Sequence, residues 1–225
     1  MLTDGGACVI LWLLLSGANV AKTTAAPCNP NAQVDIYFMI DASGSVKAQN
    51  FPHLLQFVNI LIGSLPIGQN QVRVGVYRFN HQPTFIFPLN RYYNKAAMQR
   101  AVSAIRFTAG TTGTFRVLRQ MRLNGFTAAN GDRPGVHNIG ILITDGISNN
   151  PYQTIAEATA CKRAGIELFC VGAQIPSMKE VTAIASKPKK PHLFRVNKFH
   201  QMKSQAPAIF KKICSQISKY FSNGE

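Results

Sequence analysis

Apolar residues along the chain form short unbroken runs that alternate with stretches of helical spacing. Two of these runs lie within residues 34–40 and 136–144, and they are typical of strands buried on both faces in the centre of a parallel sheet. Between residues 46 and 65, the apolar positions recur every three to four residues, which predicts one buried helix face. These positions are Phe51, Leu54, Leu55, Val58, Leu61 and Ile62.

The same two patterns continue to the end of the chain. They predict further strands over 72–79, 84–87, 166–171 and 192–196, and helices over 94–105, 115–123, 152–164, 177–185 and 199–221. Residues 124–136 contain three glycines and one proline and should form an exposed loop. The alternation of strands and helices, with one early hairpin, predicts a doubly wound α/β domain. Its sheet should be mostly parallel, with one antiparallel edge strand and helices on both faces.

The N-terminus differs from the rest of the chain. Residues 9–15 are wholly apolar and are followed by Ser-Gly-Ala, which is typical of a secretory signal peptide over residues 1–21. No Lys or Arg precedes this run, so a membrane anchor or an ordinary helix are the alternatives, although seven residues are too few to span a bilayer. We expect a linker over 22–32, one domain over 33–221 and a short tail over 222–225. The protein should therefore be secreted.

Oxygen-bearing side chains follow the two central strands. Asp41, Ser43 and Ser45 end the first, and Asp145 ends the other, while Thr112 lies in a Gly/Thr-rich loop between two predicted helices. In open α/β sheets, ligands bind at the carboxyl ends of the strands. Hard oxygen donors of this kind suit Mg²⁺, Mn²⁺ or Ca²⁺. The alternative is that the hydroxyl residues only cap helices and that Asp145-Gly146 is a turn.

Three separated motifs carry a resemblance to a known family. Asp41-x-Ser43-x-Ser45, then Gly110-Thr111-Thr112, then Ile143-Thr144-Asp145-Gly146 resemble the metal-ion-dependent adhesion site of the von Willebrand factor type A domain. The resemblance covers about residues 33–220 and extends to secreted members such as matrilins and non-fibrillar collagens. Phe115 and Arg116 depart from it, since relatives often have small residues there.

The resemblance implies a role for each motif residue. Ser43 and Ser45 would bind the metal directly, Thr112 directly or through water, and Asp41 and Asp145 partly through water. Because hydroxyls are neutral, the ion, Mg²⁺ or alternatively Ca²⁺ or Mn²⁺, would keep an open position for a carboxylate of the partner. Such a partner would be an extracellular matrix protein, for example a collagen.

Cysteines add a constraint on the fold. Cys8 lies in the expected signal peptide, which leaves four in the mature chain. A bond between Cys28 and Cys214 would clamp both ends of the domain and stabilise it by roughly 4–5 kcal/mol. Cys161 and Cys170 would form a second bond, or else remain buried free thiols.

The chain is strongly basic, with 24 Lys and Arg against 9 Asp and Glu. Basic residues are dense near the C-terminal strand and form a second group in the middle of the chain. The first group comprises Lys187, Lys189, Lys190, His192, Arg195, Lys198, His200 and Lys203, and the second Arg100, Arg106, Arg116, Arg119 and Arg122. They favour binding to sulfated glycans or other acidic polymers, and the alternative is a solvated surface that aids solubility.

Catalysis is disfavoured by the motifs. Ser43 does not lie in a Gly-x-Ser-x-Gly elbow, and the chain has no phosphate-binding loop and no His-rich zinc set. We therefore expect no enzyme, no binding to nucleic acid and no stable insertion in a membrane. Two functions remain: a metal-dependent adhesion module that docks an acidic group, or a cationic matrix component that binds acidic polymers by charge.

Overall fold

A six-stranded sheet forms the centre of the protein. The computed structural model describes residues 28–220, so the expected signal peptide and C-terminal tail lie outside the described part. The strand order is β3-β2-β1-β4-β5-β6, and only β3 is antiparallel to its neighbour. The strands are β1 (Val34–Asp41), β2 (Val72–Phe79), β3 (Pro83–Phe87), β4 (His137–Thr144), β5 (Glu167–Ala173) and β6 (Leu193–Val196). The predicted doubly wound sheet with one antiparallel edge strand is confirmed.

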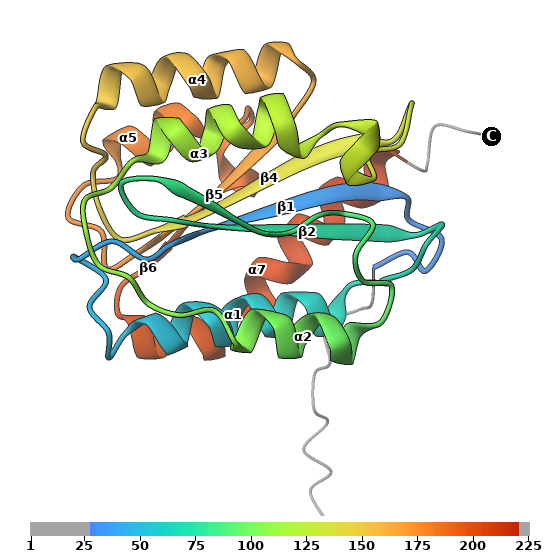
Figure 1. Cartoon of the computed structure of the whole chain (residues 1–225), viewed down its shortest axis with the longest axis horizontal. Coiled ribbons are helices and arrows are strands. Elements are labelled where there is room, and N and C mark those ends of the chain that lie inside the picture. The colour runs from blue at the N-terminus through green and yellow to red at the C-terminus, as the bar shows by residue number, and fades with distance from the viewer. Residues whose placement is uncertain (1–27, 221–225) are drawn as a thin grey trace, which may run out of the picture.

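Helices cover both faces of the sheet (Figure 1). On one face lie α1 (Phe51–Ser64), α2 (Lys95–Ser103) and α7 (Met202–Ile217), and on the other α3 (Thr114–Gln120), α4 (Pro151–Arg163) and α5 (Lys179–Ile184). A short α6 (Lys189–His192) leads into β6. None of the described helices is both long and apolar enough to cross a membrane.

Alternate residues of β1 enter two separate cores. Val34, Ile36, Phe38 and Ile40 pack with α1 and α7, whereas Tyr37 and Met39 pack with α3, α4 and α5. All of these β1 residues are fully buried. This explains why the run lacks the apolar–polar alternation of a half-exposed strand.

Several helix boundaries differ from the predicted ones. The helix expected to start after Ser45 begins only at Phe51, because Lys47 adopts a left-handed φ of 64° and the segment before the helix forms turns. The helix α3 continues as a π-helical turn over Met121–Gly125, and a 3-10 turn follows over Ala128–Asn130. Part of the expected loop over 124–136 is therefore ordered turn structure.

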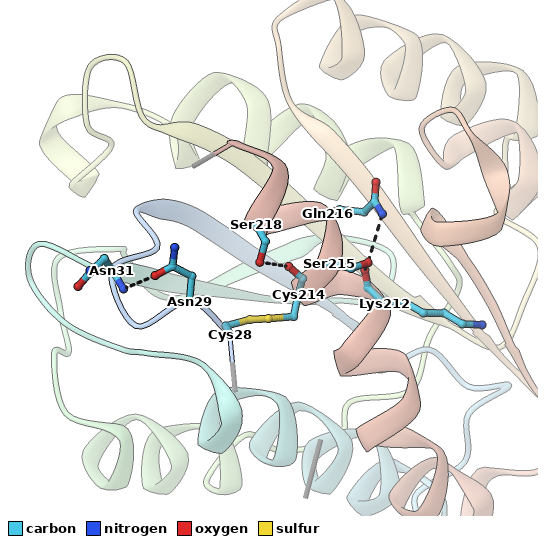
Figure 2. Close-up of a disulfide and its surroundings, with 8 residues drawn as sticks. All are labelled: Cys28, Asn29, Asn31, Lys212, Cys214, Ser215, Gln216 and Ser218. Atoms are coloured by element: carbon cyan, nitrogen blue, oxygen red, sulfur yellow. Dashed lines mark hydrogen bonds between the residues drawn. A yellow bond between two sulfur atoms is a disulfide. The ribbon is translucent and has the colours of Figure 1, made fainter. Parts of the chain in front are cut away.

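A disulfide joins Cys28, just before β1, to Cys214 in α7 (Figure 2). It closes a sequence separation of 186 residues. The Cys214 carbonyl also accepts a hydrogen bond of 3.0 Å from Ser218 Oγ, one turn further along the chain. Both ends of the domain are thereby joined within the core that contains the buried residues of α1 and α7.

The expected bond between Cys161 and Cys170 is absent, and that prediction was wrong. Both residues are free and fully buried in the core between the sheet and α4. Cys161 Sγ donates instead to the Leu118 carbonyl of α3, at 3.6 Å. Burial raises the pKa of both thiols to about 12, so they behave as small apolar core residues rather than reactive groups.

Candidate metal centre

The carboxyl ends of β1 and β4 bring the two acidic residues of the site to one edge of the sheet. The two strands are parallel neighbours, with Ile40 paired to Ile143. Asp41 is the last residue of β1, and Asp145 directly follows β4. The strand register therefore explains how residues 104 positions apart come together.

A continuous set of hydrogen bonds links the β1 loop to β4. The carboxylate of Asp41 accepts from the Ser43 amide at 2.8 Å and from Thr144 Oγ1 at 2.6 Å. The hydroxyls of Ser43 and Ser45 lie 3.1 Å apart, and Ser45 Oγ donates to Asp145 Oδ1 at 2.8 Å. Four of the five expected ligands are thus in mutual contact, directly or through the adjacent backbone.

Thr112 completes the cluster from a third loop. A methyl group built on Gly146 would lie 3.4 Å from Ser45 Oγ and 3.9 Å from Thr112 Oγ1, so both hydroxyls face the same small space beside Gly146. The position of Thr112 is fixed by Asn149, whose side-chain oxygen accepts from the Thr112 amide at 3.1 Å. The Asn149 amide in turn donates to the Thr112 carbonyl at 2.9 Å.

The hydroxyl residues of the site do not cap helices. The residue before α1 is Asn50 and the residue before α3 is Gly113, and neither helix has a side-chain cap. Ser43, Ser45 and Thr112 are consequently free to direct their oxygens at a ligand. The capping alternative therefore fails for all three residues.

The acidic residues of the site lack a positive partner. Asp41 is fully buried and Asp145 nearly so, and neither forms an ion pair within the described residues, although the chain is rich in Lys and Arg. Burial raises the pKa of Asp41 to about 6, despite the hydrogen bonds from Thr144 and Ser43, and burial also raises the pKa of Asp145. Buried carboxylates of this kind need a compensating charge.

A divalent cation fits this arrangement. Within residues 28–220 no group of three or more His, Cys, Asp or Glu side chains is placed to hold a metal, so a site here must depend on hydroxyl oxygens as well. Two carboxylates and three hydroxyls form a hard-oxygen set that suits Mg²⁺, Mn²⁺ or Ca²⁺. A small, highly hydrated ion bound this way retains water that an incoming ligand can replace.

A cavity of about 450 Å³ opens next to the cluster. Ser45, Asp145 and Gly146 line it, together with the exposed Lys47 and Gln174. A few residues after Thr112, Arg116 stacks over the Phe115 ring, with its guanidinium carbon 4.9 Å from the ring centroid. The two bulky residues that depart from the family pattern therefore form a half-buried pair at the start of α3.

The expected basic groups are not single patches. Lys187, Lys189 and Lys190 precede the edge strand β6, and Lys198 and Lys203 follow it, so the two sets lie toward opposite ends of this strand. In the second group, Arg119 and Arg122 are paired with Glu157 at 2.7 and 2.9 Å. Arg100 lies in α2, on the far face of the sheet from α3. Proximity in sequence overstated the clustering because the elements reverse direction.

Some residues that shape the site carried no motif. Asn80 follows β2 and holds the Thr112 loop with two hydrogen bonds. Its backbone carbonyl accepts from the Gly113 amide at 2.7 Å, and its side-chain amide donates to the Ala109 carbonyl at 2.8 Å. On the other side, Ser148 donates from its amide and hydroxyl to the buried Glu180 of α5. A lone Asn or Ser in a loop has many possible roles, so these contacts required the three-dimensional structure.

Comparison with known proteins gives the same family as the motifs. The family model described as von Willebrand factor type A domain matches residues 35–208. Chicken matrilin-1 is 33% identical over 198 residues, which is 87% of this chain and 40% of that protein. Mouse collagen alpha-4(VI) chain is 28% identical over 90% of this chain and 9% of that protein. The chain thus spans less than half the length of these relatives.

Solved structures agree with this. Proximal thread matrix protein 1 from the mussel byssus is 26% identical with a TM-score of 0.75, and the match covers 84% of this chain and 49% of that one. A further structure of that protein is described as having a zinc-occupied MIDAS motif. The Plasmodium vivax TRAP protein, 23% identical with a TM-score of 0.64 over 81% of this chain and 74% of that one, shares the fold. The chain belongs to the von Willebrand factor type A domain family.

Proposed function

We propose that the protein is an extracellular matrix adhesion module that binds a divalent cation and docks an acidic group of a protein partner on it. The single observation that carries this proposal is the convergence of Asp41, Ser43, Ser45, Thr112 and Asp145 at the carboxyl ends of the strands, where no basic side chain of residues 28–220 forms an ion pair with either acid. Among the ions that fit, Mg²⁺ is our first assignment.

The balance of charge explains why the partner should supply a carboxylate. The two carboxylates formally balance a divalent ion, but Asp41 is hydrogen-bonded to Ser43 and Thr144, and we infer that both carboxylates would act partly through water instead of as direct ligands. The hydroxyls of Ser43, Ser45 and Thr112 add oxygen atoms but no charge. The ion would therefore remain electrophilic at the position that faces solvent, and a carboxylate is a stronger ligand there than water.

The adjacent cavity gives the partner a path to the ion. Ser45 is exposed and borders the cavity together with Asp145. Lys47 also lines the cavity and is exposed, so its positive charge attracts an acidic side chain on approach. We assign the cavity as the docking site of the partner segment that carries the carboxylate.

The similarity to matrilins and collagens supports matrix proteins as partners and the extracellular space as the location. The site has no serine–histidine pair of the kind that activates a nucleophile: Ser43 contacts Ser45, Ser45 contacts Asp145, and among the described residues no histidine bonds to either hydroxyl. We therefore propose a binding role without enzymatic activity.

The experiment is a binding assay against a panel of immobilised matrix proteins, including collagens, in Mg²⁺, in EDTA and at raised salt. The proposal predicts binding that is lost in EDTA and largely retained at raised salt, because a metal–carboxylate bond is screened less than a surface ion pair. An Asp41→Ala, Ser43→Ala double variant that binds as well as the wild type would exclude the mechanism. A Ser215→Ala variant is the matched control, since Ser215 lies in α7 away from the site.

A further inference from the structure

A second groove lies by the start of β5, at the end of the strands opposite to the metal centre. Its volume is about 780 Å³, and it runs between the end of α4, the start of β5, helix α5 and the segment that leads into α6. Four lysines line it: Lys162 from α4, Lys179 from α5, and Lys187 and Lys189 from the segment before β6. Only the last two belong to the basic run seen in the sequence.

Two of these lysines are held in place by backbone carbonyls. Lys162 Nζ donates to the carbonyls of Ala183 and Ile184, at 3.0 and 3.1 Å, and Lys189 Nζ donates to the Ala185 carbonyl. All three carbonyls lie at the C-terminal end of α5. An ammonium has three donors, so at least one on each lysine remains unused by the protein. The groove therefore has fixed positive charges with free donors.

Within the described part of the chain, no carboxylate forms an ion pair with these lysines. Glu167 is the one acidic residue among those lining the groove, and it accepts from His137 at 3.0 Å, from Tyr220 at 3.1 Å and from His192. Over the described residues, neither Lys179 nor Lys187 forms an ion pair. Burial and the neighbouring lysines lower the pKa of Lys162 and Lys189, as expected for like charges gathered without a counterion.

We propose that this groove binds the sulfate groups of an acidic polysaccharide. The groove is large enough for more than one anionic group, and its lysines come from three separate segments, which suits a chain of repeated charges better than a single ion. Lysine ammonium groups on flexible stems act as point charges and tolerate sulfates at variable spacing. The excess of basic residues in the whole chain adds long-range attraction.

This site is independent of the metal-dependent function, because it lies at the other end of the strands and contains no metal ligand. A matrix protein and a polysaccharide could therefore be bound at the same time, one at each end of the strands. The adhesion function can fail its own test without affecting this proposal, and the reverse also holds.

The test is a calorimetric titration of a heparin-derived hexasaccharide into the protein at physiological salt, in EDTA. Lys179→Gln with Lys187→Gln removes two exposed charges that make no side-chain bonds to the described protein. We expect binding at least about fivefold weaker, because each substitution removes one charged contact with a sulfate group. Lys198→Gln with Lys203→Gln loses the same charge at the other end of β6 and should change affinity less than about twofold.

The Lys179→Arg, Lys187→Arg variant retains charge and should bind close to the wild type. Equal weakening by the two Gln double variants would show that only net charge matters and would overturn the proposal. It would also be overturned if the wild type did not bind the hexasaccharide. Inorganic sulfate binding with equal affinity would indicate a single-ion site, and a duplex oligonucleotide binding more tightly would indicate a different polymer; either result would contradict the assignment.

Discussion

The Ser45 hydroxyl donates a hydrogen bond of 2.8 Å to Asp145 Oδ1, which joins two loops that are 100 residues apart in sequence. This contact closes the space in which the metal is expected, since Ser45 also lies 3.1 Å from Ser43 Oγ. When an ion is bound, the lone pairs of both hydroxyls would turn toward it. The hydrogen bond holds the Ser45 loop against the end of β4.

Lys47 provides a way to separate metal binding from partner binding. It lines the cavity beside the metal centre but is not one of the five ligands. We predict that Lys47→Glu weakens binding of an acidic partner by about tenfold, because an attractive charge becomes a repulsive one. Its metal affinity should stay the same or rise slightly.

The measurement for Lys47 is partner binding by surface plasmon resonance, with metal affinity measured in parallel. Lys47→Gln is the graded control and should fall between the wild type and Lys47→Glu. An unchanged partner affinity in Lys47→Glu would show that the partner does not approach through this cavity.

The Cys28–Cys214 disulfide should contribute strongly to stability. Because it closes nearly the whole domain, we predict that Cys28→Ser lowers the free energy of unfolding by roughly 2–5 kcal/mol. Cys214→Ser should cost about the same, and the double variant little more than either single change. Urea denaturation measures this; clearly additive losses would show that the two residues act separately.

Cys161 and Cys170 should behave as buried thiols. In the chain that lacks the expected signal peptide, we predict that a thiol reagent detects none of the native cysteines within minutes and two after denaturation without reductant. Burial protects both groups, and their high pKa leaves little thiolate at neutral pH. If the denatured, unreduced protein showed no thiols, a second disulfide would be present.

Glu167, the first residue of β5, should make the stability of the protein depend on pH. Burial alone would raise its pKa, but the hydrogen bonds from His137 and His192 and the charge of these residues lower it to about 2. A carboxylate whose pKa is lower in the folded than in the unfolded protein stabilises the fold when the pH is above the unfolded value. For Glu167 this stabilisation is lost as the pH falls from about 4.5 toward 2.

We therefore predict that Glu167→Gln lowers the free energy of unfolding by about 1–3 kcal/mol at pH 6, after allowance for partial exposure, and by much less near pH 3. Chemical denaturation at both pH values measures the difference. Glu157→Gln provides the comparison, since Glu157 is paired with Arg119 and Arg122 instead of histidines. A destabilisation of Glu167→Gln that is equal at both pH values would contradict the prediction.

Sequence pattern was sufficient for the sheet and for the residues placed at its edge. The composition of the run from Val34 to Asp41 predicted a central strand, and the structure buries it at every position. Asp41 and Asp145 were predictable as neighbours because each ends such a strand. The three-motif spacing then pointed to Thr112.

Long-range contacts could not be predicted in the same way. The orientation of Cys161 depends on how α4 packs against α3, which a spacing of nine residues to Cys170 does not reveal. The lysine groove brings Lys162 and Lys187 together only because α4, α5 and the segment before β6 meet at one end of the sheet. The role of Asn149 likewise depends on a loop that folds back onto Thr112.

The central claim, a divalent cation held by two acids and three hydroxyls, is tested most directly by titrating Mn²⁺ into the protein and measuring free Mn²⁺ by electron paramagnetic resonance. We predict one saturable site for each wild-type chain, displaced by excess Mg²⁺, and an affinity at least about tenfold lower in Ser43→Ala with Asp145→Ala. Binding of Mn²⁺ by this double variant with unchanged stoichiometry and affinity would contradict the account.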